Sequence, residues 1–148
     1  MFDDLDLFLI NVLQKDARIP ITRLARQLGQ PIPTIRDRIK RLEKKGIIRG
    51  YQAVIDSDKV GFSIKAIIQI RVNGVVTNPD YFLAELQQIP EVQSAYLVTG
   101  DYEAVVVIHV RDVEHLGRII YEEIPKISGV GGTNTMLVLS EAHSITTP

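Results

Sequence analysis

The chain has 148 residues, of which 45% are hydrophobic and 24% are charged, with no cysteine and a formal net charge of −1. This length allows one ordinary domain or two small ones, and the composition is typical of a soluble globular protein. It excludes a disulfide framework, thiolate catalysis and a cysteine-ligated metal site, and no apolar run approaches the ~20 residues of a membrane span.

The charge is distributed unevenly along the chain. Residues 1–50 hold 11 Lys and Arg against 6 Asp and Glu, a net charge of +5, whereas residues 51–148 hold 6 against 12, a net charge of −6. Such an asymmetry indicates two modules with different partners, and only the basic module can attract phosphates. The N-terminus is acidic and amphipathic, unlike a secretory signal, so we expect a cytoplasmic location.

The apolar spacing of the first half predicts three helices. The inward face of the first is formed by Leu5, Phe8, Leu9, Val12 and Leu13. Pro20 interrupts this pattern, and a second short helix with Leu24, Ala25 and Leu28 inward ends at Gly29, a residue suited to a left-handed helix end. A third helix runs from about Ile32 to Lys45, with Ile35, Ile39 and Leu42 inward. Together these features predict a helix-turn-helix.

The second half has a different pattern of apolar residues. Residues 47–54 predict a strand that would begin a wing. We expect residues 51–63 to link it to a second domain over residues 64–141, followed by a tail over residues 142–148. Within that domain we expect strands at 64–72, 92–99, 103–111 and around 136–139, with helices starting near Asn78 and Asp112. The order β-α-β-β-α-β predicts a ferredoxin-like sandwich, and hence an α+β protein with a winged helix-turn-helix over residues 1–50. Because the first strand is only partly apolar on its second face, we expect dimerisation to cover that face.

The polar face of the third helix is the candidate DNA reader. In a helix-turn-helix the second helix of the pair enters the major groove with its N-terminal residues first, so Pro33, Thr34, Arg36 and Asp37 would lie near base edges. Cations farther along reach phosphates more naturally; the candidates are Lys40, Arg41, Lys44 and Lys45, with Arg38 on the flank and Arg49 at the wing. The alternative is a charged face that is merely solvated. Pro31 and Pro33 supply no capping oxygen at the helix start.

Four segments carry a resemblance to a known family: LDLFLINVLQKDARIPITRLARQLG, TIRDRIKRLEKKGIIRGY, VTGDYEAVVVIHV and ISGVGGTNTMLVL. In this order and spacing the chain resembles the Lrp/AsnC regulators of transcription. The resemblance implies a DNA-binding protein that is not an enzyme and needs no cofactor. It also implies sandwich domains that pair into dimers and commonly octamers, with a small-molecule effector, usually an amino acid, bound where dimers meet.

The resemblance also implies where an effector would bind. The turn after the second strand of the sandwich matches the effector loop and comprises Val98, Thr99, Gly100, Asp101, Tyr102 and Glu103. Gly100 allows backbone N–H groups to approach a ligand carboxylate, and Asp101 or Glu103 could pair with an ammonium. The family usually has Asp where this chain has Glu103. Thr133, Thr135 and Met136 match a segment beside the cleft. The alternative for residues 100–101 is an ordinary hairpin turn.

Other residues favour no site. His109 is expected to be satisfied locally, His115 and His143 to lie on the surface, and the three have no metal-ligand spacing. The segment 129–132 (GVGG) is expected to be a turn, because it lacks the strand-to-helix context of a phosphate loop. Two rival functions remain. One is an enzyme resembling sirohaem decarboxylases, which share the two-domain layout. The other is a winged helix that contacts only proteins.

Overall fold

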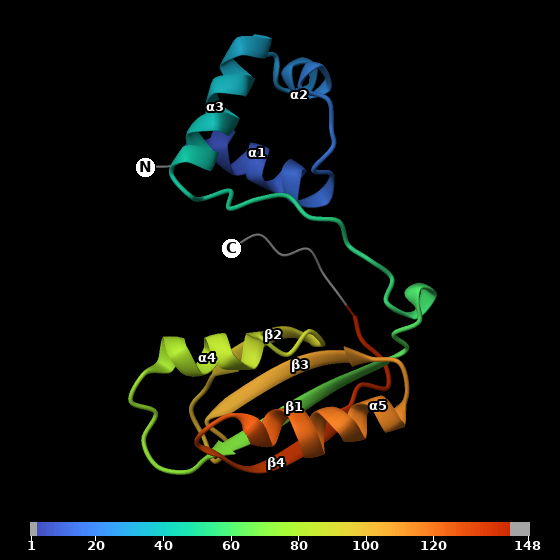
Figure 1. Cartoon of the computed structure of the whole chain (residues 1–148). Helices are drawn as coiled ribbons and strands as arrows, with labels where there is room; N and C mark the ends of the chain where they lie inside the picture. Colours follow the sequence, from blue (N-terminus) through green and yellow to red (C-terminus); the bar gives the residue numbers. More distant parts are fainter. Residues whose placement is uncertain (1–2, 143–148) are drawn as a thin grey trace. The chain divides into compact units, whose positions relative to one another are not determined.

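The structure, a computed structural model, describes residues 3–142. The chain divides between Val54 and Ile55 into two compact units, called here the first unit (residues 3–54) and the second unit (residues 55–141), which are described separately (Figure 1). None of the helices in these described residues combines the length and apolar character that crossing a membrane requires.

The first unit consists of three helices, α1 (Asp4–Lys15), α2 (Ile21–Leu28) and α3 (Ile32–Lys44), which confirms the predicted helix-turn-helix order (Figure 1). Their core contains one or two buried apolar residues from each helix, namely Leu9, Leu24, Ala25, Ile35 and Leu42. Gly29 ends α2 with φ +60°, in the left-handed region, where glycine is favoured because it has no Cβ. The apolar stripes therefore bring α3 against both other helices, except that Phe8, predicted to be inward, is 40% exposed.

The strand predicted over residues 47–54 is not formed, and this part of the chain is turn and irregular backbone. A strand is stable only when a neighbouring strand pairs with its N–H and C=O groups, and no described strand pairs with this segment. A side-chain contact ties it to α3 instead: the Tyr51 hydroxyl donates to Glu43 Oε1 at 2.8 Å. Burial, followed by this hydrogen bond, raises the pKa of Tyr51 to about 12.

The second unit confirms the β-α-β-β-α-β order. Its elements are β1 (Ile64–Val72), α4 (Pro79–Gln87), β2 (Val92–Leu97), β3 (Ala104–Val110), α5 (Val113–Arg118) and β4 (Val130–Leu137). A short 3₁₀ turn (Asp58–Val60) precedes β1, and α5 continues through a π-helical turn (Ile119–Glu123) and a 3₁₀ turn (Ile124–Lys126). All strand pairs are antiparallel, and the order across the sheet is β2-β3-β1-β4.

The two faces of this sheet differ. One face of β1 and β3 is fully buried together with apolar residues of α4 and α5, so both helices cover that face. On the other face, called here the open face, Ile67 lies opposite Val107 and Met136, and Gln69 lies opposite Val105. Met136 is 41% exposed. A sheet with one buried face and one partly accessible face agrees with the alternation predicted from the sequence.

The last strand begins earlier than predicted. Gly129, with φ +90°, makes a turn, but Gly131 and Gly132 lie inside β4 rather than in that turn. A Cβ at Gly131 would stand 2.7 Å from Asn73 Oδ1 and 3.1 Å from the carbonyl oxygen of Arg71. A side chain at position 131 would require Asn73 to move and would press on the Arg71 carbonyl, so glycine is favoured where β4 passes close to the end of β1.

Candidate nucleic-acid interface and effector site

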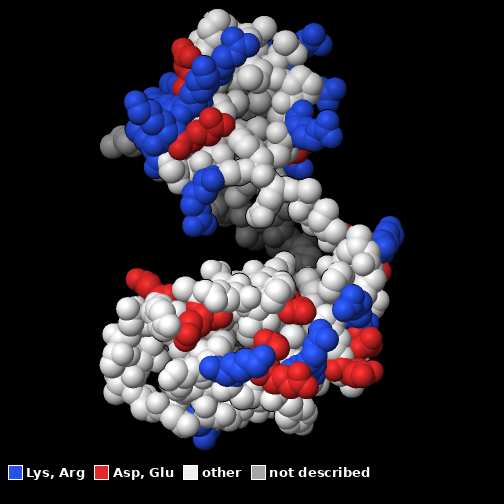
Figure 2. All heavy atoms as spheres, in the orientation of Figure 1, with Lys and Arg blue, Asp and Glu red and all other residues white. Residues whose placement is uncertain are grey.

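The exposed face of α3 carries the residues predicted to meet DNA. Arg36, Asp37, Lys40 and Lys44 are exposed and Thr34 is half-buried. Figure 2 shows Lys and Arg gathered over the part of the first unit that Figure 1 draws as α3. Among the described residues no ion pair is formed by Arg36, Lys40 or Lys44. Their charges are therefore available to an external anion.

Two other arginines of α3 are turned toward α1. Arg41 Nη2 lies 2.6 Å from Asp6 Oδ2, and Arg38 Nη1 lies 3.2 Å from Asp6 Oδ1 and also pairs with Asp3. The Asp6 side chain is 1% exposed. The Asp6 backbone N–H and then the Arg38 side chain hold the pKa of Asp3 below its ordinary value. These partners are 32 to 35 positions apart in the chain, and no spacing pattern in the sequence indicated that they would pair.

The start of α3 accommodates its prolines. Pro31 precedes the helix in an extended conformation and forms no side-chain cap, and Pro33 occupies the first turn. The first four N–H groups of a helix have no intrahelical acceptor, so proline costs no hydrogen bond there. The helix begins at Ile32, the residue that the sequence indicated. Arg49 is exposed in the irregular segment that follows α3.

The predicted effector loop is the hairpin between β2 and β3. Val98 N donates to Glu103 O at 2.9 Å, which closes the loop, and Thr99, Gly100 and Asp101 are exposed. Gly100 has φ +126°, a backbone conformation that side-chain-bearing residues rarely adopt. The tip of the hairpin therefore presents backbone groups, a hydroxyl and a carboxylate.

The base of the hairpin is tied to the end of β1. Glu103 Oε2 accepts from Val72 N at 2.8 Å, and the guanidinium of Arg71 lies 5.0 Å from the Tyr102 ring centroid. The Val72 N–H, the largest of several causes, holds the pKa of Glu103 below its ordinary value. One carboxylate oxygen of Glu103 is thus already engaged, and Asp101 is the more accessible carboxylate of the loop.

The three candidates on β4 do not lie on one face. Thr133 pairs with Ile70 and Thr135 with Ile68, on the helix-covered side, whereas Met136 pairs with Ile67 on the open face. The hairpin and β4 lie on opposite sides of β1 in the sheet order. Ala104 and Thr133 both pair with Ile70, so they share one row across the sheet. The hairpin and the start of β4 therefore lie at the same end of the sheet, on either side of β1.

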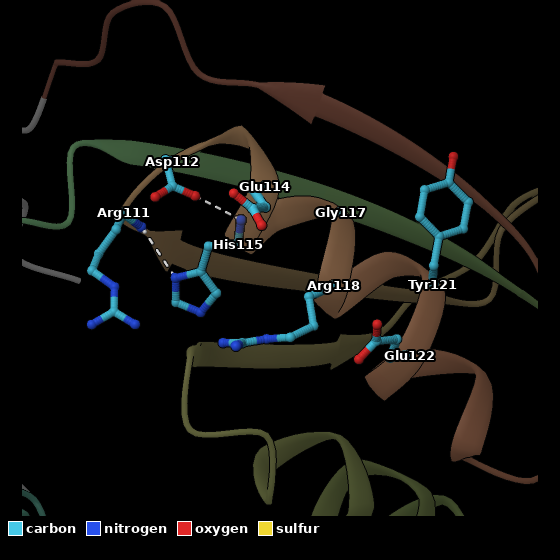
Figure 3. A pocket seen from close by; sticks show the side chains of 8 residues that line it. All are labelled: Arg111, Asp112, Glu114, His115, Gly117, Arg118, Tyr121 and Glu122. Carbon is cyan, nitrogen blue, oxygen red and sulfur yellow. Dashed lines mark hydrogen bonds between the residues drawn. The ribbon is translucent and has the colours of Figure 1, made fainter.

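Two pockets of the second unit lie away from the hairpin and β4. One pocket of about 370 Å³ lies along α5 and the π-helical turn that follows it. It is lined by Arg111, Asp112, Glu114, His115, Gly117, Arg118, Tyr121 and Glu122 (Figure 3). Another of about 310 Å³ is lined by Ser57, Phe62, Pro90, Glu91, Val92, Gln93 and His109. Neither includes a predicted effector residue.

His115 is buried, with 7% of its surface exposed, so its predicted surface position is wrong. The Arg111 backbone N–H donates to His115 Nδ1 at 3.3 Å (Figure 3), and Nε2 lies 2.7 Å from Glu91 Oε1. Because Nδ1 acts as acceptor, the ring proton lies on Nε2, which donates to Glu91. Burial raises the pKa of Glu91, but the hydrogen bonds from His115 and from the backbone, together with the charge of Arg118, outweigh this effect and leave that pKa below its ordinary value.

His109 lies on β3 with Nδ1 3.3 Å from Ser57 Oγ, a local partner of the kind predicted. Burial, followed by the charge of Lys65, lowers its pKa. His143 lies outside the described residues. Within the described part of the chain, no group of three or more His, Cys, Asp or Glu side chains could hold a metal ion.

Comparisons with known proteins agree with both units. Residues 65–147 match the model of the Lrp/AsnC ligand binding domain, and residues 2–49 match a winged helix-turn-helix DNA-binding model. The HTH-type transcriptional regulator FL11 of Pyrococcus furiosus is 35% identical over 147 residues, covering 99% of this chain and 95% of that protein.

Solved structures give the same result. AsnC of E. coli has a TM-score of 0.88 and 26% identity, covering 99% of this chain and 98% of that one. A feast or famine regulatory protein from M. tuberculosis, complexed with L-methionine, has a TM-score of 0.88 and 29% identity, covering 97% and 96%.

Proposed function

The chain belongs to the Lrp/AsnC family of transcription regulators, and from this premise we propose which of its residues bind DNA and which bind an effector. The proposal keeps the two functions on separate units. The first unit binds DNA through α3, and the second unit binds an amino acid that changes assembly and DNA binding.

The DNA-binding role is supported mainly by Arg36, Lys40 and Lys44, which are exposed on α3 and form no ion pair among the described residues. Pro33, Thr34, Arg36 and Asp37, in the first two turns, meet base edges, where Arg36 can form a two-pronged contact with guanine. Lys40, Lys44 and Arg49 contact phosphates. Arg38 and Arg41 were also expected to contact DNA, and their guanidinium groups bind Asp6. We propose that they hold α3 in place rather than contact phosphates.

The test uses DNA fragments selected from a random library by the wild-type protein. Arg36→Ala should weaken binding roughly 5- to 150-fold, the effect of one base contact, and Lys44→Ala should reduce the slope of log affinity against log salt by about 1. Lys59→Ala, an exposed lysine of the second unit, is the matched control. Wild-type affinity in both α3 variants would contradict the assignment, and binding that is insensitive to salt would favour the protein-contact alternative.

The proposed effector is an amino acid held by the hairpin and the start of β4. The residues are Val98, Thr99, Gly100, Asp101, Tyr102, Glu103, Thr133, Thr135 and Met136. The exposed N–H groups around Gly100 suit the ligand carboxylate and Asp101 suits its ammonium. Support comes from the M. tuberculosis relative, which was solved with L-methionine. Because neither of the two pockets described above includes these residues, we propose that a second copy completes the site.

A thermal-shift screen of the amino acids tests the effector, since a ligand that binds only the folded state raises its stability. The ligand that stabilises the wild type should stabilise Asp101→Asn far less, whereas Asp80→Asn, an exposed carboxylate on α4, should respond like the wild type. An equal response in both variants would place the ammonium elsewhere.

We further propose that the open face of the sheet forms a dimer interface and that dimers assemble further, up to octamers. The half-buried apolar residues Ile67 and Val107 at the centre of that face support pairing with a second copy. The family relationship favours a regulator without catalytic activity over a sirohaem-decarboxylase-like enzyme. Tetrapyrrole turnover by the purified protein would reverse that preference.

A further inference from the structure

Asp6 occupies an unusual position for a carboxylate in the first turn of a helix. Such carboxylates ordinarily interact with the helix N-terminus while remaining in water. Asp6 belongs to the capping box of α1, in which its backbone N–H donates to Asp3 Oδ1 at 2.9 Å. Its side chain is nevertheless 1% exposed, because α3 lies over it. The burial of a carboxylate is costly unless cations and hydrogen bonds compensate, and here two arginines do so.

Those two arginines come from the helix proposed to contact DNA. Arg38 and Arg41 are three positions apart, which places them on neighbouring turns of the same side of α3. Each directs a guanidinium to a different oxygen of Asp6, at 3.2 Å and 2.6 Å respectively. Two contacts on successive turns resist rotation of α3 about its own axis. The rotation of this helix decides which side chains face outward, and so which face the groove.

The same contacts also keep Arg38 and Arg41 from binding the phosphates of DNA. α3 carries five Lys and Arg. Arg38 and Arg41 are bound to the carboxylates of Asp3 and Asp6, whereas Arg36, Lys40 and Lys44 form no ion pair among the described residues. Contacts to phosphates add affinity for any DNA and carry no sequence information. A helix whose arginines were all free would bind DNA more tightly but discriminate less.

We propose that Asp6 is a specificity-determining positioning residue. By binding Arg38 and Arg41 it keeps both guanidinium groups from the phosphate backbone and fixes the rotation of α3, and thereby it raises the preference for cognate over random DNA. This inference rests on the proposed role of α3 as the DNA-contacting helix.

The test compares Asp6→Asn with Asp4→Asn in the full chain. Both substitutions remove one negative charge from the first turn of α1, but Asp4 is exposed and forms no ion pair among the described residues. Affinity is measured across a salt series for a selected cognate duplex and for a scrambled duplex of equal length. In Asp6→Asn, affinity for the scrambled duplex should rise and its salt slope should steepen by about 1 to 2, because one or two arginines become free to contact phosphates. The ratio of cognate to scrambled affinity should fall at least about 10-fold, the size of one lost base contact. Asp4→Asn should keep the wild-type ratio.

An unchanged ratio and slope in folded Asp6→Asn would overturn the proposal. If Asp6→Asn does not fold, Arg41→Gln tests the proposal instead. Because the proposal keeps Arg41 away from DNA, the salt slope for the scrambled duplex should remain that of the wild type, and a decrease of about 1 would show that Arg41 contacts a phosphate. A failure of the proposed DNA-contacting role of α3 gives a different result. In that case Arg36→Ala would bind the cognate duplex as tightly as the wild type does.

Discussion

Arg41 Nη2 lies 2.6 Å from Asp6 Oδ2, although the two residues are 35 positions apart in the chain. This ion pair joins the first turn of α1 to the last turns of α3. The carboxylate is buried and the guanidinium is about half-exposed, with 43% of its side chain accessible. The stability of the first unit should therefore depend on Arg41 more than on the other exposed cations of α3.

We predict that Arg41→Ala destabilises the first unit by about 2 kcal/mol. Removing one partner of a buried ion pair costs roughly 3–5 kcal/mol, and the loss should be smaller here because Arg38 also binds Asp6 and Arg41 is partly exposed. Hydrogen exchange of peptides from α1 and α3 measures this locally, with about 30-fold faster exchange corresponding to the predicted loss. Lys44→Ala, without an ion pair in the described residues, is the control. Equal exchange rates in both variants would mean that the ion pair contributes no net stability.

Gly100 allows a second prediction because its φ of +126° disfavours any residue with a Cβ. No atom lies within 4 Å of the position that a Cβ would occupy, so Gly100→Ala should introduce backbone strain without a clash. We expect the free energy of unfolding of the second unit to fall by about 1 kcal/mol and its melting temperature to fall by roughly 4–8 °C. Gly132→Ala, in β4 with open space and no positive φ, should melt within a degree or two of the wild type. An unchanged melting temperature in Gly100→Ala would indicate that the hairpin relaxes to another turn type.

The pair formed by Glu91 and His115 allows a prediction about pH. The folded-state pKa of Glu91 is lowered from 4.5. The ionised carboxylate therefore stabilises the fold above the ordinary pKa, and this contribution is lost as the pH falls through the lower folded value. Glu91→Gln should be less stable than the wild type at pH 7, by about 1 kcal/mol, and the difference should shrink only below pH 4.5. Thermal melts of both proteins from pH 7 to pH 3 measure it. Glu114→Gln, an exposed carboxylate on α5, should show no such convergence.

The open face of the sheet allows a prediction about assembly. Ile67 lies between Val107 and Met136 at the centre of that face. A charge introduced there would lose its hydration in a dimer interface without gaining a partner. Ile67→Glu should therefore shift the protein to monomers in analytical ultracentrifugation. Val75→Glu, which charges a residue that is 87% exposed beyond β1, should retain the wild-type assembly. A dimer that persists in Ile67→Glu would require a different interface.

Much of the fold was predictable because its determinants are local. Apolar residues every three or four positions indicated α1, α2 and α3, and alternation indicated the buried face of β1. Both kinds of pattern depend only on the geometry of a helix or strand and on neighbours in sequence. The strand expected over residues 47–54 is the instructive exception. Its residues are suited to a strand, but a strand also needs a pairing partner, which local sequence does not specify.

The candidate site was predictable to a different extent. The exposure of Arg36, Lys40 and Lys44 follows from their side of the helix, and the positive φ of Gly100 agrees with its residue type. The pair between His115 and Glu91 could not be predicted, because its partners are 24 residues apart and neither stands in a recognisable motif. The engagement of Glu103 by the Val72 backbone has the same origin, since it depends on how the hairpin meets the end of β1.

The sequence by itself determined the order of helices and strands, the division of charge between the two halves and the basic face of α3. These are properties of residue types and their spacing along the chain. The tertiary structure alone decided which cations of that face remain available and which are bound. Arg38, Arg41 and Arg36 are the same residue type on one helix, but only the first two lie over Asp6. We propose different roles for them because a buried carboxylate must be neutralised by the cations that folding brings within hydrogen-bonding distance.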